Sequence, residues 1–180
     1  ENVYYYLTVY NEPYTQPAEP DSLDVEGLLK GIYLYQGAGK QRKKNAQILA
    51  SGVGMNWALK AAKLLESDWG VNASVWSVTS WNELRRDGLA VDRHNLLNPS
   101  NQRTAYITSK LRGAEGPVIA VSDYMRAVQD QVAPWVEQEF ASLGTDGFGL
   151  SDTRGALRRH FKVDAESIVI ATLSSLAKAG

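Results

Sequence analysis

The sequence predicts an α/β fold of three layers, in which helices cover both faces of a sheet of about five mostly parallel strands. Short strand-like runs alternate along the chain with longer segments of helical periodicity, which is typical of such folds. The run 118–121 is continuously apolar, as expected for a parallel strand buried on both faces. The connection between the runs 32–35 and 46–50 is shorter than a parallel crossover requires, so we expect these two strands to form an antiparallel pair.

Residues 1–26 are predicted to form an arm in front of a domain that comprises residues 27–180. Tyr, Val and Thr dominate residues 3–9, and this composition favours a strand. Prolines make the next part of the arm extended and stiff. Because the chain begins with Glu1 and its first strand lacks an evident partner, we expect a fragment of a longer polypeptide, with an arm that is mobile or contacts another molecule.

The middle of the chain carries a helix with one apolar face, which begins after residue 54 and ends at Gly70. A strand over 73–78 follows, and residues 80–83 have the Ser-x-x-Glu spacing of a capping box. Residues 84–97 are polar and contain a glycine, so we expect only a short helix and a loop there. We expect Trp81 to contact another domain.

The last third is predicted to continue the alternation of strands and helices. A helix over 124–136 precedes the last strand, 140–143. Two further helices are predicted over 156–160 and 165–179, and Asp164 is the expected N-cap of the second.

Composition excludes several classes of partner. The net charge of −1 offers no electrostatic attraction for nucleic acid or an anionic membrane. No apolar run approaches the roughly 20 residues of a membrane helix, and the absence of cysteine suits the reducing cytoplasm. The densest basic cluster fits a solvated hairpin tip, with a docking patch for an acidic partner as the alternative. It consists of Lys40, Arg42, Lys43 and Lys44.

Two glycine-containing segments fail the requirements of phosphate-binding loops. Gly52-Val53-Gly54 places Trp57 where a third glycine is needed, and 37–40 lack the flanking residues of a Walker loop. Both are interpreted as tight turns. The two histidines, His94 and His160, lack the spacing of metal ligands, so we expect no metal site.

Residues 143–154 form the most distinctive segment of the sequence, a glycine-rich connection between the last predicted strand and a helix. Its glycines permit positive φ angles or close approaches, and the polar residues after them fit a helix cap. We expect a rigid loop in which Asp146 accepts backbone or arginine hydrogen bonds. We also expect Phe148 to make an apolar contact and Arg154 to pair with a carboxylate.

Two carboxylates directly follow predicted strands, Asp123 and Asp146. Open α/β sheets bind ligands at this edge, although capping, loop support and contact with another domain are alternative roles. The candidate structural or interface residues are Asp123, Gly144, Asp146, Gly147, Phe148 and Arg154.

The string Gly-Thr-Asp-Gly-Phe-Gly-Leu-Ser-Asp-Thr-Arg at 144–154 resembles the end of the thiamine-dependent pyruvate dehydrogenases, the homodimeric decarboxylating component of the bacterial complex. Transketolases share a looser form of the motif but usually continue it with Ala-Pro, so the resemblance favours the C-terminal domain of pyruvate dehydrogenase. The likeness covers nearly the whole chain and includes residues 1–14, 30–33, 77–80, 122–125 and 160–164.

This resemblance implies a transketolase C-terminal-like fold in an enzyme that decarboxylates pyruvate on thiamine diphosphate and transfers acetyl to lipoyl on a partner acyltransferase. In the family, the groups that hold thiamine diphosphate and magnesium lie on the two preceding domains, so no catalytic, cofactor or metal residue is expected in this chain. The implied partners are the remaining domains, the second subunit of a homodimer and the acyltransferase.

Two alternatives to a structural role remain open. The first is a regulatory or docking module that binds a complex partner or a small ligand at the edge with Asp123 and Asp146. The second is a freestanding α/β enzyme, against which the lack of a complete catalytic motif counts.

Overall fold

A computed structural model describes residues 2–7, 9, 11–39 and 44–178. Its centre is a five-stranded sheet with the order β1-β3-β2-β4-β5. Strands β2 to β5 run parallel, and β1 pairs antiparallel with β3 at one edge. The predicted fold class is therefore confirmed. The strands are β1 (Tyr33–Gln36), β2 (Lys44–Ala50), β3 (Val71–Ser77), β4 (Val118–Val121) and β5 (Phe140–Leu143).

The predicted pairing of the first two strands is wrong. β1 pairs with β3, with Tyr33 opposite Ser77, and β2 lies between β3 and β4. The last five residues of β2 are buried, and such a strand is stabilised in the sheet centre with a neighbour on each side. The short connection constrains the direction of β1, but it does not decide which strand β1 pairs with.

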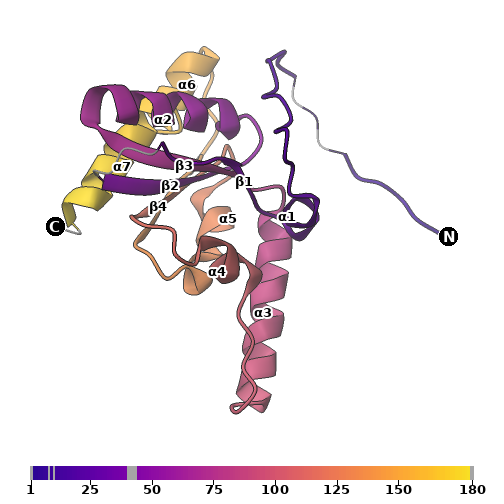
Figure 1. The fold of residues 1–180 in the computed structure, drawn as a ribbon. Helices are drawn as coiled ribbons and strands as arrows, with labels where there is room; N and C mark the ends of the chain where they lie inside the picture. The colour runs from indigo at the N-terminus through magenta and orange to yellow at the C-terminus, as the bar shows by residue number, and fades with distance from the viewer. Residues whose placement is uncertain (1, 8, 10, 40–43, 179–180) are drawn as a thin grey trace.

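One face of the sheet is covered by α2 (Gly54–Trp69) and α7 (Ala165–Lys178) (Figure 1). Ala58 and Leu65 of α2 and Ile168 of α7 are fully buried against this face. Gly70 ends α2 in the left-handed conformation, with a φ of 61°, as the sequence predicts. The short helix α6 (Arg154–His160) lies beside α2.

The opposite face carries the helices α3 (Trp81–Leu97), α4 (Tyr106–Leu111) and α5 (Arg126–Asp130) and the 3₁₀ turn η1 (Ala133–Trp135) (Figure 1). Their buried side chains pack on Leu49, Val118 and Ala120 of the sheet. None of the helices in the described residues has the length and apolar character needed to cross a membrane.

Helix α3 is longer than the sequence predicts. Ser80 caps it as expected, because its Oγ accepts a hydrogen bond from the Glu83 N–H at 3.1 Å. The helix then continues through Gly88 to Leu97. A Cβ atom at Gly88 would lie 2.4 Å from the ring of Trp135, so this glycine makes room for the tryptophan and does not end the helix.

Two further expectations require correction. The predicted helix 124–136 is divided into α5 and η1, because Met125 is extended and Pro134 lacks the N–H that a continuing helix would need. Trp81, which we expected to contact another domain, is only 4 % exposed, and its Nε1–H donates to Ser51 Oγ at 3.0 Å. It therefore belongs to the core of this domain.

The arm consists of two different parts. Residues 2–7 and 9 form no helix or strand and are exposed, so the predicted strand is absent from these described residues. Residues 11–24 lie against the domain and lead into α1 (Val25–Lys30) (Figure 1). The carboxylate of Asp24 caps α1 through the Gly27 N–H at 2.9 Å. The second part thus contacts its own domain, whereas the sequence predicts an arm that is mobile or contacts another molecule.

Candidate functional site

The carboxyl ends of the parallel strands meet at one edge of the sheet, which we call the carboxyl edge. It is formed by the segments 51–54, 78–80, 122–126 and 144–154, which follow β2, β3, β4 and β5. Two cavities of about 780 and 260 Å³ are formed by this edge together with the arm. Because open α/β sheets place their binding surfaces at this edge, it is the candidate site.

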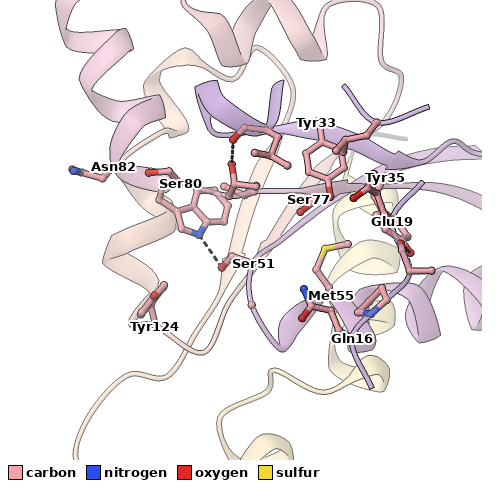
Figure 2. A pocket seen from close by; sticks show the side chains of 18 of the residues that line it. Gln16, Glu19, Tyr33, Tyr35, Ser51, Met55, Ser77, Ser80, Asn82 and Tyr124 are labelled. Atoms are coloured by element: carbon pink, nitrogen blue, oxygen red, sulfur yellow. Dashed lines mark hydrogen bonds between the residues drawn. The ribbon is translucent and has the colours of Figure 1, made fainter. Parts of the chain in front are cut away.

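The larger cavity has an aromatic and hydroxyl-rich lining (Figure 2). Tyr33 and Tyr35 contribute from β1, and Tyr124 contributes from the loop after β4. The Tyr35 hydroxyl donates to the carbonyl oxygen of Ala18 at 2.8 Å, which holds the arm as one wall of the cavity. Glu19 is the single charged side chain among the described residues that line it.

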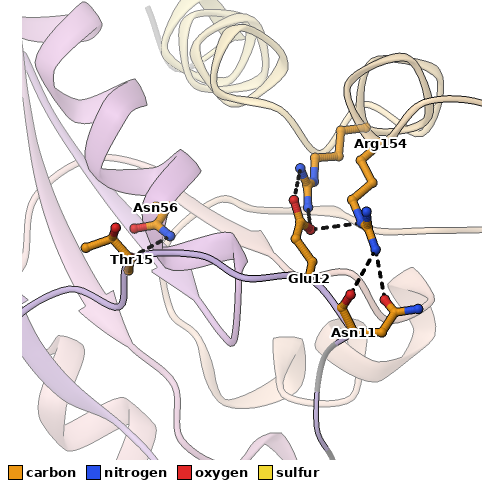
Figure 3. A network of polar contacts seen from close by, with 6 residues as sticks. Asn11, Glu12, Thr15, Asn56 and Arg154 are labelled. Atoms are coloured by element: carbon orange, nitrogen blue, oxygen red, sulfur yellow. Dashed lines mark hydrogen bonds and ion pairs between the residues drawn. The ribbon is translucent and has the colours of Figure 1, made fainter.

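The smaller cavity is bordered by a carboxylate that two arginines share (Figure 3). Glu12 Oε2 lies 2.5 Å from Arg158 Nη2 and 3.2 Å from Arg154 Nε. Arg154 Nη2 also donates to Asn11 Oδ1 at 2.9 Å, and the Arg158 guanidinium lies 5.2 Å from the centre of the Trp57 ring. We call the contacts of Glu12 with Arg154 and Arg158 the clasp. The expected pairing of Arg154 with a carboxylate is present here.

The first residues of the glycine-rich loop are bound to the neighbouring loop after β4. Thr145 N–H donates to the Tyr124 carbonyl at 2.8 Å, and Asp146 Oδ1 accepts from the Arg126 N–H at 3.0 Å. A Cβ atom at Gly144 would lie 2.5 Å from the Tyr124 carbonyl oxygen, so only glycine fits this approach. Asp146 therefore accepts the backbone hydrogen bond that the sequence analysis expects.

The next residues of the loop leave the body of the domain. Gly147 has a φ of +92°, and a Cβ atom added there would have no neighbouring atom within 4 Å. Phe148 is 96 % exposed, so the apolar contact expected of it is not made within the described part of this chain. Asp123 borders the smaller cavity, which Thr145 of the glycine-rich loop also lines.

A partly buried ion pair fixes the end of the arm to the opposite face of the domain. Lys110 Nζ lies 2.5 Å from Asp24 Oδ2. The hydrogen bond from Lys110, followed by that from the Gly27 N–H, lowers the pKa of Asp24, and the same pair raises the pKa of Lys110. The second part of the arm, residues 11–24, is thus held at both ends, by the clasp and by α4.

The described residues contain no group of three or more His, Asp or Glu side chains placed to hold a metal ion. Of the basic cluster, residues 40–43 lie outside the described residues, and Lys44 begins β2 in an exposed position. The docking role of that cluster therefore stays a prediction.

The partner of the two arginines in the clasp was not predicted from the sequence. Arg154 and Arg158 are four residues apart, which places them on one helix face and indicates a shared partner. Nothing in the sequence identifies that partner as Glu12, which is more than 140 residues away.

The fold and the edge define a member of a known domain class. Residues 31–164 match the model of the transketolase-like TK C-terminal domain, and the chain belongs to this family. The transketolase from Leishmania mexicana has the same fold, with a TM-score of 0.60 and 21 % identity over 88 % of this chain and 20 % of that one.

Curated relatives are more similar in sequence. The pyruvate dehydrogenase E1 component of Mycolicibacterium smegmatis is 61 % identical over 181 residues, and that of Mycobacterium tuberculosis is 56 % identical. The E1 component of Escherichia coli K12 is 44 % identical over 182 residues. Each match covers 100 % of this chain and 20 % of the relative, so the chain spans about a fifth of the length of these proteins.

Proposed function

We propose that this chain is the C-terminal domain of a homodimeric pyruvate dehydrogenase E1 component. The observation that carries the proposal is the identity of 61 % to such a protein, which extends over all of this chain, arm and glycine-rich loop included. The whole enzyme would decarboxylate pyruvate on thiamine diphosphate in the cytoplasm and transfer the acetyl group to lipoyl on a partner acyltransferase. Residues 1–26 would connect this domain to the preceding one.

The role proposed for the domain itself is to support assembly of the enzyme through the carboxyl edge. The clasp and the hydrogen bond that Asp146 accepts from the Arg126 N–H hold this edge in a fixed shape. Phe148 and Leu150 project from it with 96 % and 51 % of their surface exposed. Exposed apolar side chains on a fixed base are characteristic of a protein interface.

The residues of the edge do not fit a magnesium diphosphate site. Asp146 is the acidic residue flanked by Thr145 and Gly147 in the glycine-rich motif, but one of its oxygens accepts the Arg126 N–H and the other lies 3.9 Å from Arg126 Nε. A carboxylate in this arrangement supports a loop. Thiamine diphosphate and magnesium are accordingly proposed to bind to other domains of the enzyme.

The activity is tested with the full-length enzyme, thiamine diphosphate and magnesium, by release of CO₂ from pyruvate. We expect turnover from the full-length protein and no saturable binding of thiamine diphosphate to the isolated chain in calorimetric titration. Binding by the isolated chain in the micromolar range would contradict the proposed division of labour.

The assembly role is tested by Phe148→Ser in the full-length enzyme, with Ile170→Ser on α7 as the control because Ile170 is also exposed, at 68 %. We expect the Phe148 variant alone to lose dimer in sedimentation, with turnover per dimer unchanged. For Asp146→Asn we expect weaker assembly. An Asp146→Asn enzyme that assembles normally but is slow in the chemical step would identify this residue as catalytic instead.

The alternative function is a docking or regulatory module at the same edge. It is favoured by one observation, the cavity of about 780 Å³ lined by Tyr33, Tyr35 and Tyr124. Saturable binding of a metabolite or of the acyltransferase that Tyr33→Phe weakens would support it.

A further inference from the structure

Helix α3 extends beyond the body of the domain (Figure 1). Its second half exposes large apolar side chains, with Leu89 at 45 %, Leu96 at 81 % and Leu97 at 72 %. Covering one such side chain would contribute roughly 2 kcal/mol, so a partner surface over these leucines would be stabilising. The helix therefore has an apolar surface that its own domain does not use.

Two carboxylates of α3 are hydrogen-bonded to neighbouring elements of the domain. Asp87 Oδ2 accepts the Tyr106 N–H at 2.6 Å, and Asp92 Oδ1 accepts the Trp135 Nε1–H at 3.1 Å. These two carboxylates are directed toward the neighbouring helix α4 and toward η1 of the domain. The positive charge of Arg85 and Arg93 stays at the exposed surface.

A stripe of five residues runs along the exposed side of α3. The last four lie three, four, seven and eleven residues after the first, and this spacing places all five on one helix face. Together with His94 and Asn98 they line a surface hollow of about 460 Å³. This stripe, which we call the α3 stripe, consists of Arg86, Leu89, Ala90, Arg93 and Leu97.

The side chains of the α3 stripe indicate the chemistry of the surface that would complement it. Leu89, Ala90 and Leu97 offer apolar contact, and Arg86 and Arg93 lie beside them as two cations. Arg86 is paired with Glu83 of the same helix at 2.7 Å, but this pair is exposed and contributes little by itself. A complementary surface therefore carries leucine-like side chains in its centre and carboxylates at its margin.

We propose that the α3 stripe docks an acidic amphipathic segment of the same enzyme that lies outside this chain. The inference rests on the proposed function, under which about four-fifths of the polypeptide is additional to this domain, as in relatives of which the match covers 20 %. Charge disfavours a second copy of the stripe as the occupant, since two stripes in contact would bring four arginines together.

The test is hydrogen exchange of segment 86–97 in the purified full-length enzyme, without other components of the complex. Arg93→Gln and Leu97→Gln are expected to speed exchange of this segment about fivefold or more. The control for the cation is Arg85→Gln, on the same helix but outside the stripe. The control for the leucine is Leu29→Gln on α1, because Leu29 and Leu97 are both 72 % exposed. Arg93→Lys keeps the cation and is expected to exchange like the wild type.

Three results would overturn the proposal. Equal exchange in stripe variants and their controls would show that nothing covers the stripe. Protection that appears only after the acyltransferase is added would assign the surface to a different partner, and a crosslink between Leu97→Cys residues of two subunits would assign it to a second copy. Turnover of pyruvate by the wild-type enzyme is measured in the same preparation, and its absence would contradict the proposed function separately from the docking.

Discussion

The two halves of the glycine-rich loop differ in how they are held. The base, Gly144 to Asp146, is bound to the loop after β4 by backbone and carboxylate hydrogen bonds. The tip, from Gly147 to Leu150, extends into solvent, and Phe148 is 96 % exposed. One sequence motif thus combines a base that maintains the fold of this domain with a tip whose contacts are available to another surface.

The largest loss of stability is expected at the base of the loop, for Gly144→Val. A Cβ atom at Gly144 would lie 2.5 Å from the Tyr124 carbonyl oxygen and 2.8 Å from the Arg126 nitrogen, and both are backbone atoms. We expect the free energy of unfolding to fall by about 3 kcal/mol, measured by urea denaturation. A loss below about 1 kcal/mol would mean that the base is not tightly held.

The second-largest loss of stability is expected at the clasp, for Arg158→Ala. Arg158 and Glu12 have side-chain exposures of only 19 % and 25 %, so removal of Arg158 leaves a partly buried carboxylate with Arg154 as its remaining cation in the clasp. We expect a loss of about 2 kcal/mol and faster proteolysis within residues 11–24. Lys60→Ala serves as control, because its pair with Glu166 is half-exposed.

A smaller loss of stability is expected for Asp164→Asn, at the N-terminus of α7. Asp164 caps α7 through the Ser167 N–H at 2.9 Å and pairs with Arg159. Burial raises the pKa of Asp164, but the hydrogen bonds from Ser167 and Arg159 outweigh burial and lower it below its ordinary value of 3.8. We expect the substitution to cost about 1 kcal/mol at neutral pH.

The pH dependence follows from the sign of that shift. Because the folded-state pKa of Asp164 lies below the unfolded-state pKa, its contribution is complete above the ordinary value of 3.8 and is lost as the pH falls through the folded-state pKa. Urea midpoints of wild type and Asp164→Asn should therefore converge in acid. A difference that does not shrink as the pH falls below 3.8 would contradict this linkage.

Gly147→Val tests the junction between base and tip. Its φ of +92° is unfavourable for a β-branched residue, although the added side chain would meet no atom within 4 Å. We expect a loss of about 1 kcal/mol from backbone strain alone, well below that of Gly144→Val. Equal losses at both glycines would remove the distinction between base and tip.

The smallest effect on this domain is expected for Phe148→Ser at the tip. Because its side chain is exposed, the free energy of unfolding of the chain should change by less than about 0.5 kcal/mol. The same substitution is the one expected to impair assembly of the full-length enzyme. A large loss of stability in the isolated chain would place Phe148 among the fold-maintaining residues.

Local patterns in the sequence were sufficient to predict most of the helices and strands. The apolar run 118–121 becomes the fully buried strand β4, and the periodic face of α2 packs on the sheet. The caps at Ser80 and Asp164 form as expected. These features depend on residues within a few positions of one another, which is why a sequence pattern records them.

Other features depended on groups that are distant in the chain. Gly88 does not end α3, because the ring of Trp135 lies against it, and β1 pairs with β3 because β2 is buried in the sheet centre. The clasp joins Glu12 to Arg158, and the helical spacing of Arg154 and Arg158 does not predict which residue pairs with them. The sequence by itself determined the layers, the helix caps and the position of the glycine-rich connection between β5 and α6. Only the tertiary structure decided strand order, the course of the arm and the exposure of Phe148, because these follow from packing between segments that no local pattern relates.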